Sequence, residues 1–587
     1  MLLAAVVLMP DDYRRLGRSA MAQAFAVSNV YFYGDVDYFA GAARTKPLLH
    51  TWSLAVEEQF YLVLPPLLML LVGRWRLART RLAIALAALG AASFVWSVAT
   101  LSRDPQAAFF LLPSRAWEML LGSLLATVPA GSPDAIPRRI RSLLGAIGFA
   151  LVAGSIAALT EATPFPGPAA LPAVLGTVLI IASGGCSRSV NAVLSSRPLV
   201  GLGLISYSLY LWHWPLIALA ECYWAPLPAT GLTLAVAASL AAAVLSWRFV
   251  EQPIRHPQPG RSLSPGRFVW RVVQVQTAVI AIGGSLDLTH GLPSRMPPAI
   301  AEAAAFEKGH TVTTEQVLAG ELASLGVDDS AVRPTFLLWG DSHAMAVSGL
   351  IDAMARERGL RGLAAIKSHN SSHLISLPGE DEIAARNAAV ERLIAAHNLT
   401  DVLLAERWEM SLAYRPGAVW LGKPGDRPRL SDSEIAAADR VLPELCERLG
   451  RLGCRVHLLA QIPLAGTDDG LFSMRVARAI REGHAIDGLP RAELDAIAAS
   501  NWRPTLESLA KRPHVRLIDA TDRFFDGDRA TVFVDGRCCY RDDNHLNPYG
   551  AERLLRPELA PLFDGWRRIA QQPRPLQTSA GVGPIVR

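Results

Sequence analysis

The sequence has little cysteine, few clustered basic residues and a small net charge. Its 587 residues include six cysteines, and none forms the paired CxxC pattern of a zinc site. The formal net charge is only +5, and no dense run of lysine and arginine occurs. Nucleic-acid binding needs a basic face, so we expect no nucleic acid among the partners of this protein.

Long apolar runs, in contrast, dominate the first half of the chain. Hydrophobic residues make up 51% of the sequence and the mean hydropathy is +0.26, too apolar for an ordinary soluble enzyme. Eight windows approach the roughly 20 apolar residues that cross a bilayer. They run approximately over 52–73, 82–101, 108–128, 142–160, 170–185, 198–220, 229–247 and 269–287. We therefore expect a polytopic α-helical membrane domain.

Some of these windows contain charged residues, among them Glu57, Glu58, Arg115 and Glu118. Ionisable groups at membrane depth are costly, and they usually face a bundle interior or a polar cavity. All four are therefore candidate functional residues of the membrane domain. An open alternative places Glu57 and Glu58 at the membrane interface without a functional role.

The distribution of arginine between the windows indicates the orientation of the chain. One side receives the arginines near positions 74–81, 138–141, 188–197 and 248–267, and the other receives only Arg103. The positive-inside rule makes the first side cytoplasmic, so the last window carries the chain outward. We therefore expect the second half to lie outside the cytoplasm, in a periplasmic or extracellular position. Five cations before the first full window do not fit the rule: Arg14, Arg15, Arg18, Arg44 and Lys46.

Four cysteines lie in this second half, where an oxidising compartment would permit one or two disulfides. Free buried thiols are the open alternative. The four are Cys446, Cys454, Cys538 and Cys539.

The second half alternates strand-like and helix-like segments. Strands are predicted at 335–339, 401–405, 455–460 and 515–519, and helices between them include 380–397 and 433–449. This alternation is typical of an α/β domain with a parallel sheet and helices on both faces. The predicted domains are a membrane domain at 1–287, a linker at 288–332, an α/β domain at 333–570 and a tail at 571–587.

Two short segments of the α/β domain carry chemistry. In FLLWGDSH, at positions 336–343, an apolar strand ends in glycine and Ser342 follows at an expected helix start. A helix N-terminus at the carboxyl edge of a sheet offers N–H groups to a developing oxyanion, which suits a nucleophile. In RDDNH, at positions 541–545, His545 is a candidate base and Asp542 its partner. Asp543 competes with Asp542, but the spacing favours Asp542.

These two segments together resemble the SGNH (GDSL-like) hydrolase superfamily. The resemblance implies Ser342 as nucleophile, His545 as base and Asp542 as the residue that orients it. Members of that superfamily complete the oxyanion hole with a glycine and often with the asparagine of a Gly-x-Asn-Asp motif. Here the predicted strand 401–405 is followed by Glu406, Arg407 and Trp408 instead, so the remaining oxyanion donor is unassigned.

The first half resembles the acyltransferase-3 family. Its most specific match is HTWSLAVEEQFYL at positions 50–62, and others are RAWE at 115–118, SYSLYLWHWP at 206–215 and VEQPIR at 250–255. That family normally opens with a helix that carries an arginine and a histidine. No residue before Asp11 matches that histidine. Either the N-terminus is truncated or its start is misassigned, or the membrane half is inactive, and we favour truncation.

Several histidines have competing interpretations. His50 is a candidate membrane-domain residue that shuttles protons, or a hydrogen-bonded structural histidine. His213, between two tryptophans, is better interpreted as an interfacial anchor. His343 follows Ser342 and is expected to point elsewhere. The run from His369 to His373 is interpreted as a polar loop, and we expect no metal site.

The combined resemblance implies an O-acyltransferase, and more specifically an O-acetyltransferase, with no bound cofactor. A cytoplasmic thioester such as acetyl-CoA would donate the acyl group. The acceptor would be a cell-surface glycan such as lipopolysaccharide O-antigen, exopolysaccharide or peptidoglycan. The alternative hypothesis is a membrane-anchored carbohydrate esterase.

Overall fold

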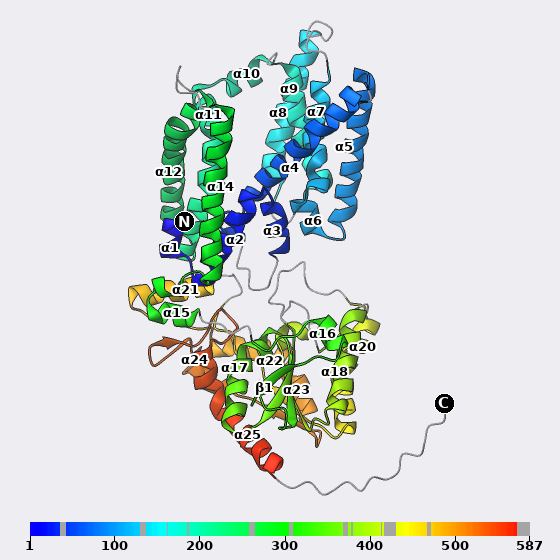
Figure 1. Cartoon of the computed structure of the whole chain (residues 1–587), viewed down its shortest axis with the longest axis vertical. Coiled ribbons are helices and arrows are strands. Elements are labelled where there is room, and N and C mark those ends of the chain that lie inside the picture. Colours follow the sequence, from blue (N-terminus) through cyan, green and yellow to red (C-terminus); the bar gives the residue numbers. More distant parts are fainter. Residues whose placement is uncertain are drawn as a thin grey trace, which may run out of the picture. The chain divides into compact units, whose positions relative to one another are not determined.

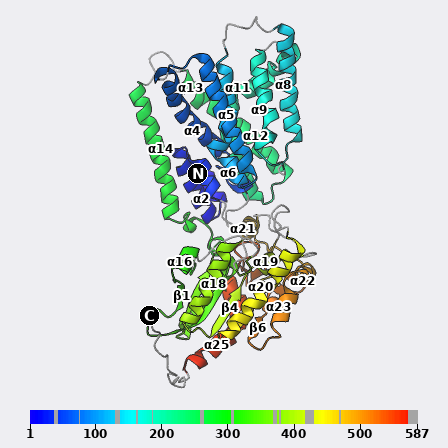
Figure 2. The same ribbon diagram turned by 90° about the vertical axis from the view of Figure 1, so that its right-hand side faces the viewer.

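The computed structural model divides the chain into two compact units, Met1–Arg295 and Met296–Arg587. It describes residues 1–35, 43–74, 76–128, 137–160, 163–184, 187–256, 264–304, 309–367, 374–376, 380–412, 414–415, 430–466 and 471–571. Figures 1 and 2 show the helical first unit and the mixed second unit in two views.

The first unit is built from helices alone in its described residues. They are α1 (Leu2–Val7), α2 (Pro10–Ala24), α3 (Ser28–Gly34), α4 (Thr51–Leu68), α5 (Arg79–Leu101), α6 (Pro105–Phe110), α7 (Leu112–Ala126), α8 (Arg138–Ala158), α9 (Gly167–Ser183), α10 (Arg188–Leu194), α11 (Arg197–Trp224), α12 (Ala229–Ser246), α13 (Gln252–Arg255) and α14 (Pro265–Leu288). Six helical segments in the described part of the chain are long and apolar enough to cross a membrane: Thr51–Arg74, Arg79–Leu101, Arg138–Ala158, Arg197–Trp224, Ala229–Arg255 and Pro265–Leu288.

Two of the eight predicted windows do not form helices of that length. The window 108–128 is wrong as one span, because the chain breaks at Leu111 into α6 and α7. Leu111 has an extended backbone and Pro113 lies in the first turn of α7, where proline favours a helix start. The window 170–185 corresponds to the shorter apolar helix α9. The polar residues Arg115 and Glu118 therefore lie on a short helix that begins with this break.

Close helix packing in the first unit depends on small residues. A Cβ atom at Gly148 of α8 would lie 2.6 Å from the carbonyl oxygen of Gly176 in α9. In an apolar environment, helices associate through such close contacts between small residues. The pair α8 and α9 is thus packed backbone to backbone.

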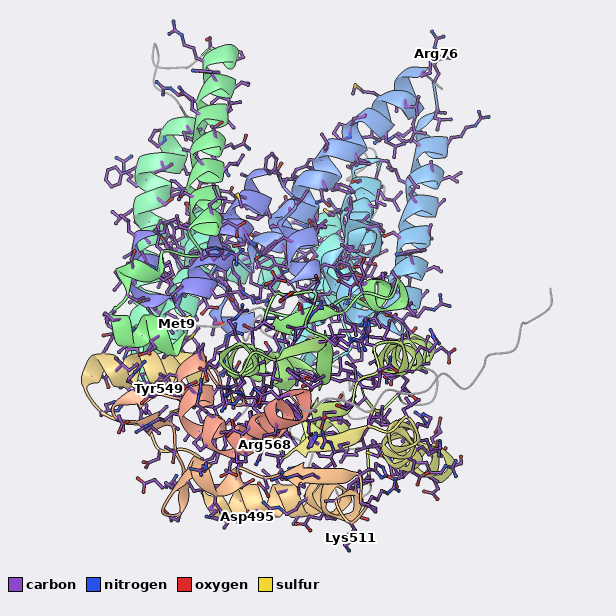
Figure 3. The ribbon with its side chains drawn as sticks, turned by 60° about the horizontal axis from the view of Figure 1, so that its bottom comes forward. Met9, Arg76, Asp495, Lys511, Tyr549 and Arg568 are labelled. Carbon is purple, nitrogen blue, oxygen red and sulfur yellow. The ribbon has the colours of Figure 1, made fainter. Side chains whose placement is uncertain are left out.

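Figure 3 shows Met9, at the start of α2, and Arg76 at opposite ends of the helical unit. The cations of this unit that violate the charge rule are all ion-paired. The pairs are Arg14 and Arg18 with Asp287 (2.6 and 2.7 Å), Arg15 and Lys46 with Asp35 (3.2 and 2.8 Å), and Arg44 with Glu221 (3.4 Å). Three carboxylates thus pair with the five cations.

The second unit contains a six-stranded sheet in the order β1-β3-β2-β4-β5-β6. The strands are β1 (Ala323–Gly326), β2 (Pro334–Gly340), β3 (Arg361–Ile366), β4 (Asp401–Ala405), β5 (Arg455–Leu459) and β6 (Val515–Ile518). All neighbours are parallel except β1 with β3. The predicted parallel sheet is confirmed, with one antiparallel strand at its edge. The antiparallel strand β1 comes from the segment 288–332 that was interpreted as a linker, and β3 had not been predicted.

Helices cover both faces of this sheet, as predicted. The helices of the second unit are α15 (Pro298–Ala303), α16 (Thr314–Leu318), α17 (Ser342–Glu357), α18 (Asp381–Ala396), α19 (Trp408–Ser411), α20 (Asp432–Arg451), α21 (Phe472–Glu482), α22 (Arg491–Ser500), α23 (Arg503–Leu509), α24 (Pro548–Gly550) and α25 (Arg556–Gln571). Short strand pairs β7 (Phe525–Asp526) with β8 (Arg529–Ala530), and β9 (Phe533–Val534) with β10 (Arg537–Cys538), follow β6.

The alternation of side chains along β2 explains the two layers. Leu337 and Trp339 join the main core with residues of α18 and α20. Phe336 points to the opposite face, where its ring stacks on Trp566 of α25 with centroids 4.6 Å apart. Successive strand residues face opposite sides, so a run of apolar residues fits a sheet that is buried on both faces. Figure 1 shows α17 on one side of the sheet and α18 with α20 on the other.

The four cysteines of the second unit are free and buried. The structure thus favours the thiol alternative over the disulfides for Cys446, Cys454, Cys538 and Cys539.

Candidate active site

Ser342 is the first residue of α17, directly beyond the carboxyl end of β2. Gly340 is required at this turn, because a Cβ atom there would overlap the carbonyl oxygen of Ala405 at the end of β4. Asp341 caps the helix, and its Oδ1 accepts a hydrogen bond from the backbone N–H of His343 (2.8 Å). This local geometry places the Ser342 hydroxyl at the helix N-terminus, as the sequence predicted.

Three predicted residues, far apart in the chain, form one hydrogen-bonded series. The Oγ of Ser342 lies 2.9 Å from Nε2 of His545. Nδ1 of His545 lies 2.9 and 3.0 Å from the two carboxylate oxygens of Asp542. His545 is fully buried and Ser342 is 7% exposed. The distances are those of hydrogen bonds between a nucleophile, a base and the group that orients the base.

The charge of Asp542 is stabilised although the residue lies within the protein. Burial would raise the pKa of its carboxyl group, but the neighbouring charge of His545, hydrogen bonds from this histidine and the charge of Arg541 lower the pKa below its usual range. Its Oδ1 also accepts the backbone N–H groups of His545 (2.7 Å) and Asn544 (3.1 Å). Asp542 is therefore a carboxylate at neutral pH, and it accepts a hydrogen bond from Nδ1–H of His545. That tautomer leaves Nε2 as the acceptor for the proton of Ser342.

The histidine segment is anchored by residues that sequence reasoning did not single out. Asn547 is fully buried, its Nδ2 donates to the carbonyl of Cys538 (2.8 Å) and its Oδ1 caps α24 at Gly550 (2.8 Å). Tyr540 donates to the carbonyl of Pro463 (2.8 Å). The Asn-Pro pair before α24 is a typical helix start and was the available signal in the sequence.

Asp341 has a second structural role. Its Oδ2 accepts the backbone N–H of Arg407 (2.9 Å), which follows β4. Burial raises the pKa of Asp341, and the N–H donors of Arg407 and His343 oppose that rise. The residue before the candidate nucleophile thus ties the ends of β2 and β4 together.

The prediction that His343 points away from the site is wrong. Its ring centroid lies 4.7 Å from that of His545, and the side chain is 2% exposed. The loop that carries His545 covers the first turn of α17, so successive residues of that turn both contact it. Burial lowers the pKa of His343 well below its usual value, and the charges of His545 and Arg407 act in the same direction. His343 is accordingly a neutral neighbour of His545.

A separate cavity of about 540 Å³ lies in the first unit. Glu57, Arg115 and Glu118 line it, together with Trp52, Ser53, Val56, Phe60, Tyr61, Met119, Gly122 and Ser123. The guanidinium of Arg115 lies 5.1 to 5.7 Å from the ring centroids of Trp52, Phe109 and Phe165, and 3.3 Å from a carboxylate oxygen of Glu118. The helix break at Leu111 therefore presents a paired charge to a cavity inside the helical unit.

The remaining membrane candidates differ in position. Glu58 is exposed and does not line this cavity. His50 is buried, and in the described part of the chain neither ring nitrogen has a hydrogen-bond partner. Its ring centroid lies 5.7 Å from that of His213, whose Nδ1 is 2.8 Å from the carbonyl oxygen of Tyr210. Tyr210 in turn donates to the carbonyl of His50 (2.7 Å).

Glu251 pairs with Arg255 at a distance of 3.2 Å, and Ser208 also donates to Glu251 (2.8 Å). The run from His369 to His373, the tail residues 572–587 and Cys186 lie outside the described residues.

Comparison with known proteins yields two family matches. Residues 14–248 match the model of an acyltransferase domain, and residues 310–561 match that of an SGNH domain fused to AT3 domains. The peptidoglycan O-acetyltransferase OatA of Listeria monocytogenes is 33% identical over 270 residues, which cover 43% of this chain and 42% of that protein. The putative peptidoglycan O-acetyltransferase YrhL of Bacillus subtilis is 31% identical, covering 44% of this chain and 43% of that protein.

The O-acetyltransferase OatA of Staphylococcus aureus strain MRSA252 is 28% identical, covering 48% of this chain and 49% of that protein. The chain thus matches less than half the length of these curated relatives. Among solved structures, the periplasmic domain of a lipopolysaccharide acetyltransferase of Salmonella ser. Paratyphi A is 13% identical, with a TM-score of 0.30, and the match covers 44% of this chain and 91% of that one.

Proposed function

We propose that this chain, a fusion of an AT3-type acyltransferase domain with an SGNH domain, is an O-acetyltransferase of a bacterial cell-surface glycan. The observation that carries the proposal is the hydrogen-bonded series from Ser342 through His545 to Asp542. The names of relatives as peptidoglycan O-acetyltransferases support a glycan acceptor. The candidate acceptors are peptidoglycan, lipopolysaccharide O-antigen and exopolysaccharide.

Acyl transfer at this site follows from the roles of the three side chains. The Ser342 oxygen attacks the acyl carbon while Nε2 of His545 takes the hydroxyl proton, and the carbonyl electron pair moves onto oxygen. Collapse breaks the bond to the leaving group, which takes the proton from His545, and Ser342 is left as an ester. A glycan hydroxyl then gives its proton to His545 and attacks this ester. Loss of Ser342 as leaving group, reprotonated by His545, completes the transfer.

The membrane unit would supply the acyl group to this site. A cytoplasmic thioester such as acetyl-CoA is the proposed donor, used as a substrate rather than as a bound cofactor. The arginine-rich loops support a cytoplasmic side opposite to the SGNH domain, which would then lie outside the plasma membrane. The cavity with Arg115 and Glu118 supports a polar passage for the donor within the helices.

A membrane-anchored carbohydrate esterase is the second candidate, because the same triad can pass an acyl group to water. The cavity in the membrane unit favours the transferase, since an anchor needs no polar interior.

The test compares the full-length wild-type chain with Ser342→Ala in a bacterial host that lacks its own glycan O-acetylase. Alkali-labile acetate on the purified envelope glycan is measured. We expect acetate with the wild type and none with Ser342→Ala, while the control Ser348→Ala, a buried serine of the same helix, keeps it. Unchanged acetate in Ser342→Ala would contradict the nucleophile assignment. Release of acetate from an acetylated glycan, without transfer to an added acceptor, would favour the esterase.

A further inference from the structure

The segment after β4 leaves the sheet beside the segment that carries Ser342. Gly340 and Ala405 are paired in the register of the parallel strands β2 and β4. Ser342 and Arg407 therefore leave the sheet side by side at its carboxyl edge. This is the segment in which Glu406, Arg407 and Trp408 replace the expected Gly-x-Asn-Asp pattern.

The backbone N–H groups of this edge are already committed. Those of His343 and Arg407 donate to Asp341 (2.8 and 2.9 Å), and that of Trp408 donates to Oε1 of Gln461 (2.6 Å). None of these three can also serve an oxyanion without breaking a buried hydrogen bond, which costs about 1–3 kcal/mol. A side chain of this edge is therefore the candidate for a second donor besides the N–H of Ser342.

The side chain of Arg407 fits that requirement. It is 5% exposed, and its Nε donates to Oε1 of Glu409 (2.7 Å), which is itself 1% exposed. A guanidinium carries five N–H donors in a fixed fork, so a bond through Nε orients the whole group. Glu409 thus holds the guanidinium of Arg407 in place by the hydrogen bond that it accepts from Nε. The backbone N–H of Arg407 is bonded to Asp341, the residue directly before Ser342 (2.9 Å), and its charge helps to lower the pKa of His343, the residue directly after it.

We propose that the guanidinium of Arg407, positioned by Glu409, stabilises the oxyanion together with the backbone N–H of Ser342. This inference rests on the proposed serine mechanism. When Oγ of Ser342 bonds to the acyl carbon, the carbonyl π pair becomes a lone pair on oxygen, and Arg407 donates a hydrogen bond to that oxygen. No proton leaves Arg407, since its guanidinium stays charged throughout. Preorganised donors of this kind act mainly on the transition state, because the negative charge develops only there.

The test uses the purified full-length protein and hydrolysis of p-nitrophenyl acetate and of its thiono analogue. Sulfur in place of the carbonyl oxygen is a poor hydrogen-bond acceptor, so the ratio of oxo to thiono rates reports donation to the oxyanion. The variants are Arg407→Gln, Arg407→Lys and, as a matched control, Arg386→Gln. Arg386 is 1% exposed and donates to the carbonyl of Ala365 (3.1 Å) in β3, on the other side of β2.

For Arg407→Gln we expect a fall in kcat of about 100-fold, with KM changed by less than about threefold. The oxo-to-thiono ratio should fall by at least about tenfold in Arg407→Gln and less in Arg407→Lys, and should stay at the wild-type value in Arg386→Gln. A wild-type ratio and kcat in folded Arg407→Gln would overturn the inference. If Arg407→Gln fails to fold, Glu409→Gln replaces it, and an unchanged ratio in that variant would overturn the inference equally.

Ser342→Ala separates this inference from the proposed function. If Ser342→Ala keeps its hydrolysis rate, the serine mechanism itself is contradicted. If Ser342→Ala is inactive while Arg407→Gln behaves like Arg386→Gln, only the assignment of Arg407 is lost.

Discussion

Replacement of Asp542 by asparagine tests how the base is oriented. The carboxylate accepts Nδ1–H of His545 (2.9 Å) and the backbone N–H groups of residues 544 and 545 (3.1 and 2.7 Å). In Asp542→Asn, the amide oxygen is needed by the backbone donors, so the amide NH2 turns toward Nδ1. Nδ1 must then accept, and the imidazole proton moves to Nε2, which can no longer take the proton of Ser342.

We expect the kcat for ester hydrolysis to fall by about 10³ to 10⁴, as is typical when a serine triad carries the wrong tautomer. That factor corresponds to about 4–5.5 kcal/mol of transition-state free energy. KM should change by less than about threefold, because the acid does not touch the substrate. Steady-state kinetics of the full-length protein, with circular dichroism as a check of folding, measure both constants.

Asp543→Asn is the matched control. Asp543 is adjacent and buried, and its carboxylate accepts from the Asn544 side chain (3.1 Å) rather than from His545. It should keep at least about a third of the wild-type kcat, in line with a residue outside the triad. If the two variants lost activity equally, or if Asp542→Asn kept a tenth of it, the assigned role of Asp542 would be refuted.

Three further changes probe other parts of the structure. Arg115→Gln should abolish glycan acetylation but leave p-nitrophenyl acetate hydrolysis intact. The control Arg255→Gln, which changes an exposed arginine, should affect neither activity. Loss of both activities in Arg115→Gln would contradict separate roles of the two units. Asp401→Asn should destabilise the second unit at pH 7 by about 3–5 kcal/mol in chemical denaturation. Burial would raise the pKa of Asp401, but its bonds to a histidine and an arginine lower that pKa. The stabilisation by the Asp401 carboxylate is complete above the ordinary carboxyl pKa and is lost as the pH falls through the lowered pKa. The difference in unfolding free energy between variant and wild type should therefore close in acid. A difference that stays constant with pH would contradict this role of Asp401. Gly340→Ala should lower the melting temperature, because the new Cβ atom would overlap a carbonyl oxygen. The control Gly565→Ala in α25 has open space around it and should not lower the melting temperature. Equal melting temperatures of the two variants would contradict the close approach of the two strand ends at this turn.

The elements with long apolar runs could be predicted from the sequence. Strands β2, β4, β5 and β6 lie where the hydrophobic pattern placed them. The first three are largely buried on both faces, whereas the edge strand β6 exposes Arg516. Strand β3 was missed because its residues are mostly small, and Gly362 must be small where the Phe336 ring covers it. Strand β1 was missed because a four-residue edge strand has no periodic signal.

The site itself was predictable in its residue types but not in its surroundings. Ser342, Asp542 and His545 stand in short local patterns that carry a chemical role. The contact of His343 with His545, and the bond from Arg407 to Asp341, join segments far apart in sequence. No local pattern encodes such a contact, because it depends on which strands become neighbours in the sheet.

The most direct test of the account is to trap the acyl group on the protein. Membranes that contain the full-length chain are supplied with isotopically labelled acetyl-CoA, quenched in acid within one turnover, digested and analysed by mass spectrometry. The account predicts labelled acetyl on the hydroxyl of Ser342 in the wild type, and no label at this position in Ser342→Ala. Labelled glycan formed without any acetyl on Ser342, at every quench time, would contradict it.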